Sequence, residues 1–167
     1  MFYEFLADLN FLVGFILFLC YSYQIFYTIV PFSIPPRKHK TPTKMNNIAI
    51  LIAARNESAV IGNLLDSINA QDYDASHLRT YVIADNCTDS TASIARERGA
   101  HVFERFNKEK VGKGYALDFA IDKLRESGEW EKIDGVIVLD ADNLLRENYV
   151  TEMNKTFSDG YEGRTVN

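Results

Sequence analysis

The chain has 167 residues, of which 47% are apolar and 25% are charged, and this balance suits one globular domain with a single sizeable core. Its formal net charge is −5, which argues against a general nucleic-acid binder. Residues 1–44 contain four Lys or Arg and two acids, so the remaining residues carry about −7. A body this acidic needs local basic groups or a metal cation to bind an anionic ligand.

Residues 11–30 form an uncharged run of 20 mostly apolar residues, FLVGFILFLCYSYQIFYTIV. As a helix this run would extend about 30 Å, the thickness of the hydrocarbon core of a bilayer. A cleaved secretory signal and a buried core helix are the alternatives. A signal peptide favours a basic start, whereas the first ten residues contain Glu4 and Asp8 and no Lys or Arg. We therefore predict that residues 1–30 form an N-terminal segment with a transmembrane helix at about 11–30.

Residues 31–46 combine prolines with basic residues, which predicts a stiff, extended linker. Positively charged loops stay on the cytoplasmic side of a membrane. The basic residues of this linker are Arg37, Lys38, Lys40 and Lys44. We therefore expect the protein at the cell membrane, crossing it once within this chain, with everything after Lys44 in the cytoplasm.

The rest of the chain alternates between strand-like and helix-like patterns. Strands are predicted at 47–54, 80–85, 101–105 and 135–140, and the first is a continuous apolar run typical of a strand buried on both faces. Helical patterns occur at 55–71, within 86–100, at 113–128 and from 148 onward. This alternation predicts an α/β fold with a Rossmann-like, mainly parallel sheet that binds ligands at the carboxyl ends of its strands.

Polar residues follow three of the four predicted strands. Arg55-Asn56-Glu57 follows the first, Asp85-Asn86 the second, and Asp140-Ala141-Asp142 the fourth. If the strand geometry persists, Asp140 and Asp142 point to the same side. One carboxylate can then bind Mg²⁺ or Mn²⁺, which prefer oxygen ligands, while the other holds a ligand hydroxyl or a metal-bound water. A lone Asp-x-Asp is commonly turn chemistry, but its position after a buried strand favours a binding site.

Four segments of the chain resemble the family 2 glycosyltransferases, and they occur in that family's order. The segments are AARNESAVIGNLLDSI, VIADNCTDST, VGKGYALDFAI and VIVLDAD. The resemblance implies a GT-A fold, with residues 47–167 as its donor-binding half, incomplete at the C-terminus. It also implies inverting transfer from a nucleotide sugar, expected to be a UDP-sugar, to a glycan or lipid-linked acceptor. With a membrane helix before this domain, the chain resembles the processive polysaccharide synthases of that family.

The resemblance also implies a role for each matching residue. Near the nucleotide, it implies a nucleoside pocket, a base-reading acid, a diphosphate site and a metal site. The nucleoside pocket would be formed by Ala54, Arg55 and Glu57, and Asp85 would accept from uracil N3–H. Lys113, with Gly112 and Gly114, would lie at the diphosphate. Asp142 would hold the metal, with Asp140 on the ribose or in the metal shell.

Other interpretations of these residues stay open at this point. Glu57 also suits the N-terminus of a helix, where an acid favours the macrodipole. Lys113 is equally compatible with a solvated lysine. Asp89 and Thr91 are expected to cap the helix that follows them.

The chain departs from the family pattern near its end. The family places its catalytic base in a later acidic motif, and the polymerising branch adds a Gln-x-x-Arg-Trp motif, and neither occurs before Asn167. We therefore expect the base to lie beyond Asn167 and the 167-residue chain alone to transfer no sugar. A dinucleotide-binding domain would need Gly-x-Gly-x-x-Gly after the first strand, which is absent. A non-catalytic membrane protein that retains a nucleotide-binding remnant remains an alternative.

Overall fold

The computed structural model describes residues 2–33 and 44–158. Contacts divide the chain into two units, Met1–Lys38 and His39–Asn167, and each is described by itself.

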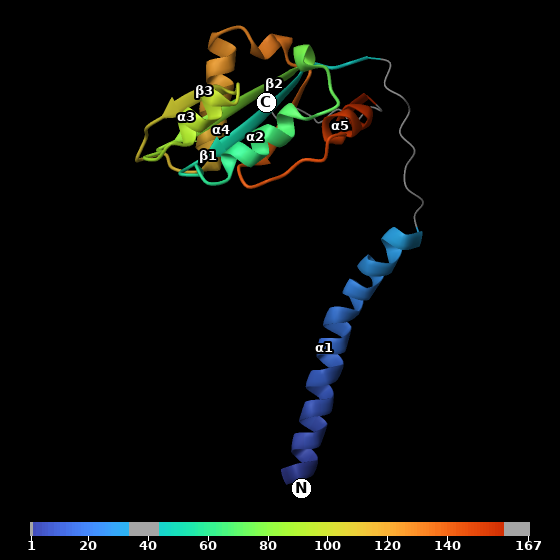
Figure 1. The fold of residues 1–167 in the computed structure, drawn as a ribbon. Helices are drawn as coiled ribbons and strands as arrows, with labels where there is room; N and C mark the ends of the chain where they lie inside the picture. Colours follow the sequence, from blue (N-terminus) through green and yellow to red (C-terminus); the bar gives the residue numbers. More distant parts are fainter. Residues whose placement is uncertain (1, 34–43, 159–167) are drawn as a thin grey trace. The chain divides into compact units, whose positions relative to one another are not determined.

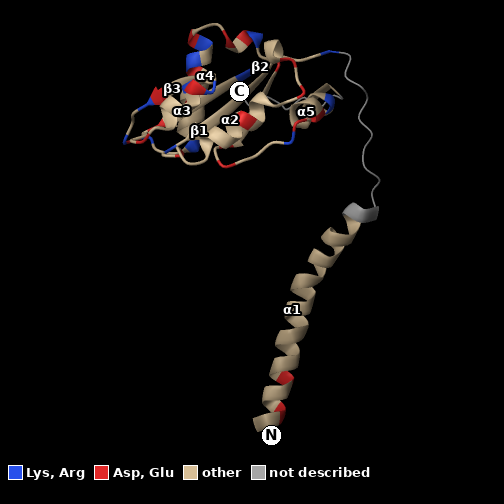
Figure 2. Cartoon of the chain, in the orientation of Figure 1, with Lys and Arg blue, Asp and Glu red and all other residues tan. Residues whose placement is uncertain are grey.

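The first unit contains one long helix, α1 (Phe2–Ser33), whose residues 2–30 are long and apolar enough to cross a membrane. Signal sequences and the core helices of soluble proteins share this length and composition. Figure 2 shows α1 without basic residues and with acidic residues only near its start. The helix begins earlier than the predicted 11–30, because the first ten residues are also largely apolar and contain no proline or glycine. Most of the predicted linker, residues 34–43, lies outside the described residues.

The second unit is built on a four-stranded sheet with the order β3-β2-β1-β4 (Figure 1). All three neighbouring pairs are parallel. The strands are β1 (Ile48–Ala54), β2 (Leu78–Asp85), β3 (His101–Arg105) and β4 (Gly135–Asp140). The predicted α/β fold with a parallel sheet is thus confirmed.

Helices cover both faces of this sheet, because successive residues of β1 point to opposite sides and both sets are apolar. Ile48, Ile50 and Ile52 pack in one core with residues of α2, α3 and α5, whereas Ala49 and Leu51 pack in a second core against α4. The helices are α2 (Ile61–Asn69), α3 (Thr91–Glu97), α4 (Lys113–Glu126) and α5 (Tyr149–Ser158), with short 3₁₀ turns η1 (Ala75–His77) and η2 (Trp130–Lys132).

The helix predicted at 55–71 is shorter in the structure, where α2 begins only at Ile61. Residues 55–60 form a turn instead, because the backbone N–H groups of Glu57 and Ser58 and the side chain of Asn56 bond to the segment that follows β2. This difference matters for function, since it leaves the residues after β1 in a turn at the end of the sheet.

The strand β4 lies at one end of the described sheet and pairs only with β1 among the residues described. Its Ile137 and Leu139 are buried, whereas Val136 and Val138 are exposed on the side that α4 covers elsewhere. Exposed valines on a strand leave an apolar surface that further protein could cover.

A buried amide pair fixes the start of the sheet. Asn46 Nδ2 donates to Asn154 Oδ1 at 2.7 Å, and Asn154 Nδ2 donates to the Lys44 carbonyl at 3.2 Å. The Tyr73 hydroxyl donates to the Asn46 carbonyl at 2.7 Å. These bonds join the residues just before β1 to α5, so the chain enters the sheet in one defined position.

Candidate functional site

The carboxyl ends of the four parallel strands lie along one edge of the sheet. We call this edge, with the turns after the strands, the carboxyl-end rim, and it comprises residues 54–58, 85–91, 105–113 and 140–143. The chain order reverses at β1, because β2 lies on one side of it and β4 on the other. Ligands of open α/β sheets bind in the crevice outside such a switch point, so the ends of β1, β2 and β4 define the candidate site.

The residues predicted for the nucleoside pocket lie together in the turn after β1. Ala54 is buried, Arg55 is exposed and Glu57 is half-buried. Asn56 adopts a left-handed φ of 56° and accepts the backbone N–H of Thr88 at 2.8 Å. No described residue forms a hydrogen bond or ion pair with the side chains of Arg55 or Glu57. Both side chains are therefore available to a ligand at this end of the sheet.

Of Asp89 and Thr91, both expected to cap the helix that follows, Asp89 bonds the first N–H of α3, whereas Thr91 is the first residue of that helix and the N-cap residue Ser90 makes no side-chain cap hydrogen bond. Asp89 Oδ1 accepts the Thr91 backbone N–H at 3.0 Å and the Thr91 hydroxyl at 2.6 Å, and its Oδ2 accepts the Ser58 N–H at 3.1 Å. The Thr91 hydroxyl is the main cause that holds the pKa of the Asp89 carboxyl well below its usual value, with Ser58 next. Thr91 Oγ1 in turn accepts the Glu57 N–H at 2.9 Å. Asp89 and Thr91 therefore join the turn after β1 to the start of α3.

Asp85 lies at the end of β2 and is 5% exposed. Its Oδ1 accepts Arg105 Nη1 at 2.6 Å and Asn86 Nδ2 at 3.1 Å. No described residue donates to its other oxygen, Oδ2. Since no fully buried polar side-chain atom of the described chain lacks a partner, Oδ2 keeps some access to solvent. One oxygen of Asp85 is therefore held inside the protein and the other is left for a ligand.

Lys113 and Asp140, predicted to meet the diphosphate and the ribose or metal, form an ion pair across the rim. Lys113 is the first residue of α4, and its Nζ lies 2.5 Å from Asp140 Oδ1. Gly112 precedes it with a φ of 130°, a conformation that L side chains rarely adopt. A Cβ added at Gly114 would meet no atom within 4 Å. The two charged side chains are 44% and 63% exposed, so the pair contributes little stability and can open for a ligand.

The two acids after β4 match the ligand set of a Mg²⁺ or Mn²⁺ ion that also binds substrate phosphates. Asp142 is exposed, and its side chain has no hydrogen-bond or ion-pair partner among residues 2–33 and 44–158. No cluster of three metal-binding side chains occurs within the same residues. Mg²⁺ commonly uses one or two carboxylates and completes its shell with water and phosphate oxygens. Asp140 and Asp142 thus fit an ion bound together with a ligand, and not a metal cage made by protein alone.

Sequence reasoning missed two residues of the rim, Arg105 and Cys87. Arg105 ends β3 and contacts Asp85, and the same strand-end argument would have found it had it been applied to the third strand. The Cys87 thiol lies 3.4 Å from both the Ala54 carbonyl oxygen and the Asn56 backbone nitrogen, which joins the ends of β1 and β2. Nothing in the pattern around Cys87 signals that contact.

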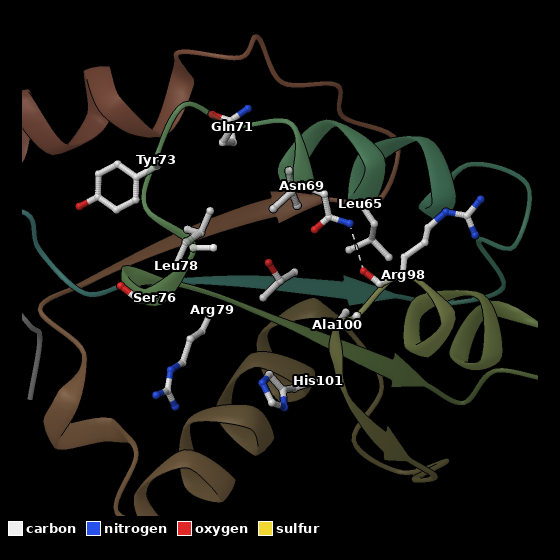
Figure 3. A pocket seen from close by; sticks show the side chains of 14 residues that line it. Leu65, Asn69, Gln71, Tyr73, Ser76, Leu78, Arg79, Arg98, Ala100 and His101 are labelled. Carbon is white, nitrogen blue, oxygen red and sulfur yellow. Dashed lines mark hydrogen bonds between the residues drawn. The ribbon is translucent and has the colours of Figure 1, made fainter.

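A cavity of about 520 Å³ lies at the other end of the sheet, beside the first residues of β2 and β3 (Figure 3). Its polar side chains are largely engaged within the protein. Gln71 bonds to the backbone of Ser67, Arg146 and Val150, and Asn69 donates to the Arg98 carbonyl. The cavity thus offers few free polar groups to a ligand, and the carboxyl-end rim remains the better candidate site.

The parallel sheet and its switch point define an open α/β domain, with a candidate ligand site at the ends of β1, β2 and β4. A profile described as "Glycosyltransferase like family 2" matches residues 46–167. The chain therefore belongs to the glycosyltransferase-like family 2. No curated protein sequence matches it significantly.

Solved structures with a similar fold are GT-A glycosyltransferases. One is the mannosyltransferase PcManGT from Pyrobaculum calidifontis in complex with GDP-Man and Mn²⁺, which is 22% identical over 81% of this chain, with a TM-score of 0.60. Another is S. aureus TarS 1–349 in complex with UDP, which is 17% identical over 68% of this chain, with a TM-score of 0.53. The chain covers 38% of the first protein's length and 32% of the second's. At these identities the likeness establishes the GT-A fold.

Proposed function

We propose that residues 47–167 form the donor-binding half of a glycosyltransferase that takes a nucleotide sugar, with a UDP-sugar as the expected donor. The observation that supports this proposal most strongly is that three kinds of group, each suited to one part of a nucleotide sugar with its metal, lie on the rim around one switch point. The rim holds a carboxylate with one free oxygen in Asp85, a cation in Lys113, and two exposed carboxylates in Asp140 and Asp142. The family supports it, and the two similar structures were solved with GDP-Man and with UDP.

Each group of the rim has a part in holding the donor. Asp85 Oδ2 would accept the ring N–H of the base, and Glu57 with the backbone of Ala54 and Arg55 would hold the nucleoside. Lys113 would move from Asp140 to the diphosphate, which is favourable because the N-terminus of α4 also attracts anions. Asp140 would then be released to the metal shell or the ribose.

We propose Asp142 and Asp140 as the residues that hold a Mg²⁺ or Mn²⁺ ion. Such an ion, when bound, neutralises the charge of the leaving diphosphate. Lys113 would add a second positive charge on the same group. The general base that deprotonates the acceptor is assigned to none of these residues.

The transfer itself would be a direct displacement at the anomeric carbon, with inversion. An acceptor hydroxyl, on a glycan or a lipid-linked sugar, forms the new glycosidic bond while the bond to the diphosphate breaks and a carboxylate takes the proton. A processive polysaccharide synthase is the form of this activity that the preceding membrane helix favours.

Isothermal titration calorimetry of the full 167-residue chain in detergent would test the donor site. We expect UDP to bind in the presence of Mn²⁺ and to bind much more weakly without it. Inorganic sulfate serves as the control for unspecific anion binding. A lack of metal-dependent binding by every nucleoside diphosphate tested would contradict the proposed function.

We further propose that α1 is a retained membrane helix within an N-terminal segment 1–30, that residues 31–46 form a linker, and that the sheet domain is cytoplasmic. The apolar length of α1 and the basic residues after it support this topology. No nucleic acid is expected as a partner, because the domain is acidic.

Cysteine labelling would test this topology. In a background where Cys20 and Cys87 are replaced by serine, we expect Ala59→Cys, an exposed position, to resist a membrane-impermeant maleimide in intact cells and to react after lysis. Tyr3→Cys, before the apolar run, is expected to react from outside. Labelling of Ala59→Cys in intact cells would refute the cytoplasmic assignment.

A further inference from the structure

Arg105 is a buried cation at the end of β3, with 7% of its surface exposed. Burial of a guanidinium is unfavourable unless charged and polar partners compensate it. Arg105 Nη1 donates to Asp85 Oδ1 at 2.6 Å, and Nη2 donates to the Lys110 carbonyl at 2.6 Å. The sheet register sets Asp85 opposite Arg105. The planar guanidinium therefore connects two separate parts of the rim.

The first part is the base-reading acid. Asn86 adds a second hydrogen bond to the same oxygen, Asp85 Oδ1, so both internal contacts of this carboxylate involve one atom. The planar carboxylate group is then fixed in rotation, and its Oδ2 is the atom that can face a ligand. Arg105 thus determines which oxygen of Asp85 is presented and in which direction.

The second part is the loop between β3 and α4, which leads to Lys113. Asn107 Oδ1 accepts the backbone N–H groups of Glu109 and Lys110, each at 2.9 Å, and Asn86 bonds to the Asn107 backbone in both directions. Arg105 holds the same loop at the Lys110 carbonyl. The loop therefore has a fixed conformation at the point where it reaches Gly112 and the start of α4.

We propose that Arg105 is a positioning residue that couples base recognition at Asp85 to the placement of Lys113 at the diphosphate. The inference rests on the proposed nucleotide site and specifies its selectivity. An ionised carboxylate only accepts hydrogen bonds, so a fixed Asp85 Oδ2 favours a base with a ring N–H, uracil or guanine. It disfavours cytosine and adenine, whose corresponding ring nitrogens are acceptors, because two acceptors would face each other.

The variant Arg105→Lys tests the coupling, because lysine keeps a positive charge beside Asp85 but lacks the fork that reaches both partners. Calorimetry with UDP and CDP in the presence of Mn²⁺ would give the two dissociation constants. We expect CDP to bind about threefold more weakly than to the unchanged protein, because Lys113 is less well placed at the diphosphate that both nucleotides carry. We expect UDP to bind about thirtyfold more weakly, because it also loses the contact with Asp85, so that the preference for UDP over CDP falls by about tenfold.

Arg96→Lys is the matched control. Arg96, on α3, also pairs with a carboxylate, that of Glu104 on β3. The Arg96 side chain is 51% exposed and lies outside the rim. We expect this variant to keep both the affinity for UDP and the preference over CDP.

The ratio of the two affinities separates the possible outcomes. A fall in affinity for UDP and CDP by the same factor would mean that Arg105 only stabilises the fold, and it would overturn the proposal. Unchanged affinities for both nucleotides would overturn it as well. Failure of the unchanged protein to bind any nucleoside diphosphate would instead refute the proposed function. Binding of UDP and CDP alike by the unchanged protein would leave the nucleotide site standing and overturn the role of Arg105.

A measurement on the unchanged protein makes the test independent of how the variant folds. Nuclear magnetic resonance of the Arg105 guanidinium reports how fast its N–H protons exchange with water. We expect exchange to slow when UDP saturates the site and to slow less with CDP. Only the ring N–H of uracil can donate to Asp85 Oδ2, so only UDP is held against the Asp85–Arg105 pair. Equal protection by the two nucleotides would contradict the coupling.

Discussion

Asp142→Ala is expected to abolish the Mn²⁺-dependent part of UDP binding and to leave the fold intact. Asp142 is exposed just past β4 and has no partner among the described residues, so its removal creates no cavity and breaks no contact seen there. If it ligates the metal, the ion loses one of the two carboxylates proposed to hold it. Loss of groups that merely support metal ligands costs about 10- to 100-fold in affinity, so loss of a ligand should reach or exceed about 100-fold.

Asp122→Ala is a suitable control for this variant. Asp122 is also an exposed acid, but it lies within α4, where its nearest cation is Arg125 at 3.9 Å. We expect that variant to bind UDP and Mn²⁺ as the unchanged protein does. Equal metal-dependent binding by Asp142→Ala and Asp122→Ala, measured by calorimetry, would remove the metal assignment.

The substitution Asp85→Asn should change the affinity for the base. An amide oxygen can still accept from Arg105 and Asn86, so the amide nitrogen would take the place of Oδ2 at the rim. A donor would then face the ring N–H of uracil, at a cost of about 1 to 3 kcal/mol. That cost corresponds to a fall in UDP affinity of about 5- to 100-fold.

The same substitution should help CDP relative to UDP, because the ring nitrogen of cytosine accepts the new donor. Dissociation constants of both nucleotides would be measured for both proteins, with thermal unfolding as a check that each is folded. Some loss of stability is expected, since Arg105 keeps its charge without an ionised partner. Equal affinity of the two proteins for UDP would mean that Asp85 serves only the structure of the rim.

The sequence was sufficient to predict the elements of the sheet but not their order. The apolar run at 47–54 and the strands that follow it were predicted closely because each is a local pattern of buried residues, and only β2 begins two residues before its predicted start at 80. That β4 pairs with β1 and not with β3 follows from the long crossover through α4, which no local pattern encodes. This crossover creates the switch point at which the site lies.

Candidate site residues at the ends of strands could be predicted from the sequence, whereas their ion pairs with residues distant in the chain could not. Asp85 and Asp140 were identified because each follows an apolar strand. The partners Arg105 and Lys113 are 20 and 27 residues away from them in the chain, and only the folded sheet brings them into contact. The turn at 55–60 was mistaken for helix because its hydrogen bonds go to Thr88, Asp89 and Thr91, which are distant in sequence.

The position of bound nucleotide is the decisive measurement for the proposed donor site, because affinity alone does not show where a ligand binds. A crystal structure of the chain with UDP and Mn²⁺ would give that location. We predict the base at Asp85, the diphosphate at Lys113 and the metal at Asp140 and Asp142. A nucleotide seated instead in the cavity beside the first residues of β2 and β3 would contradict it.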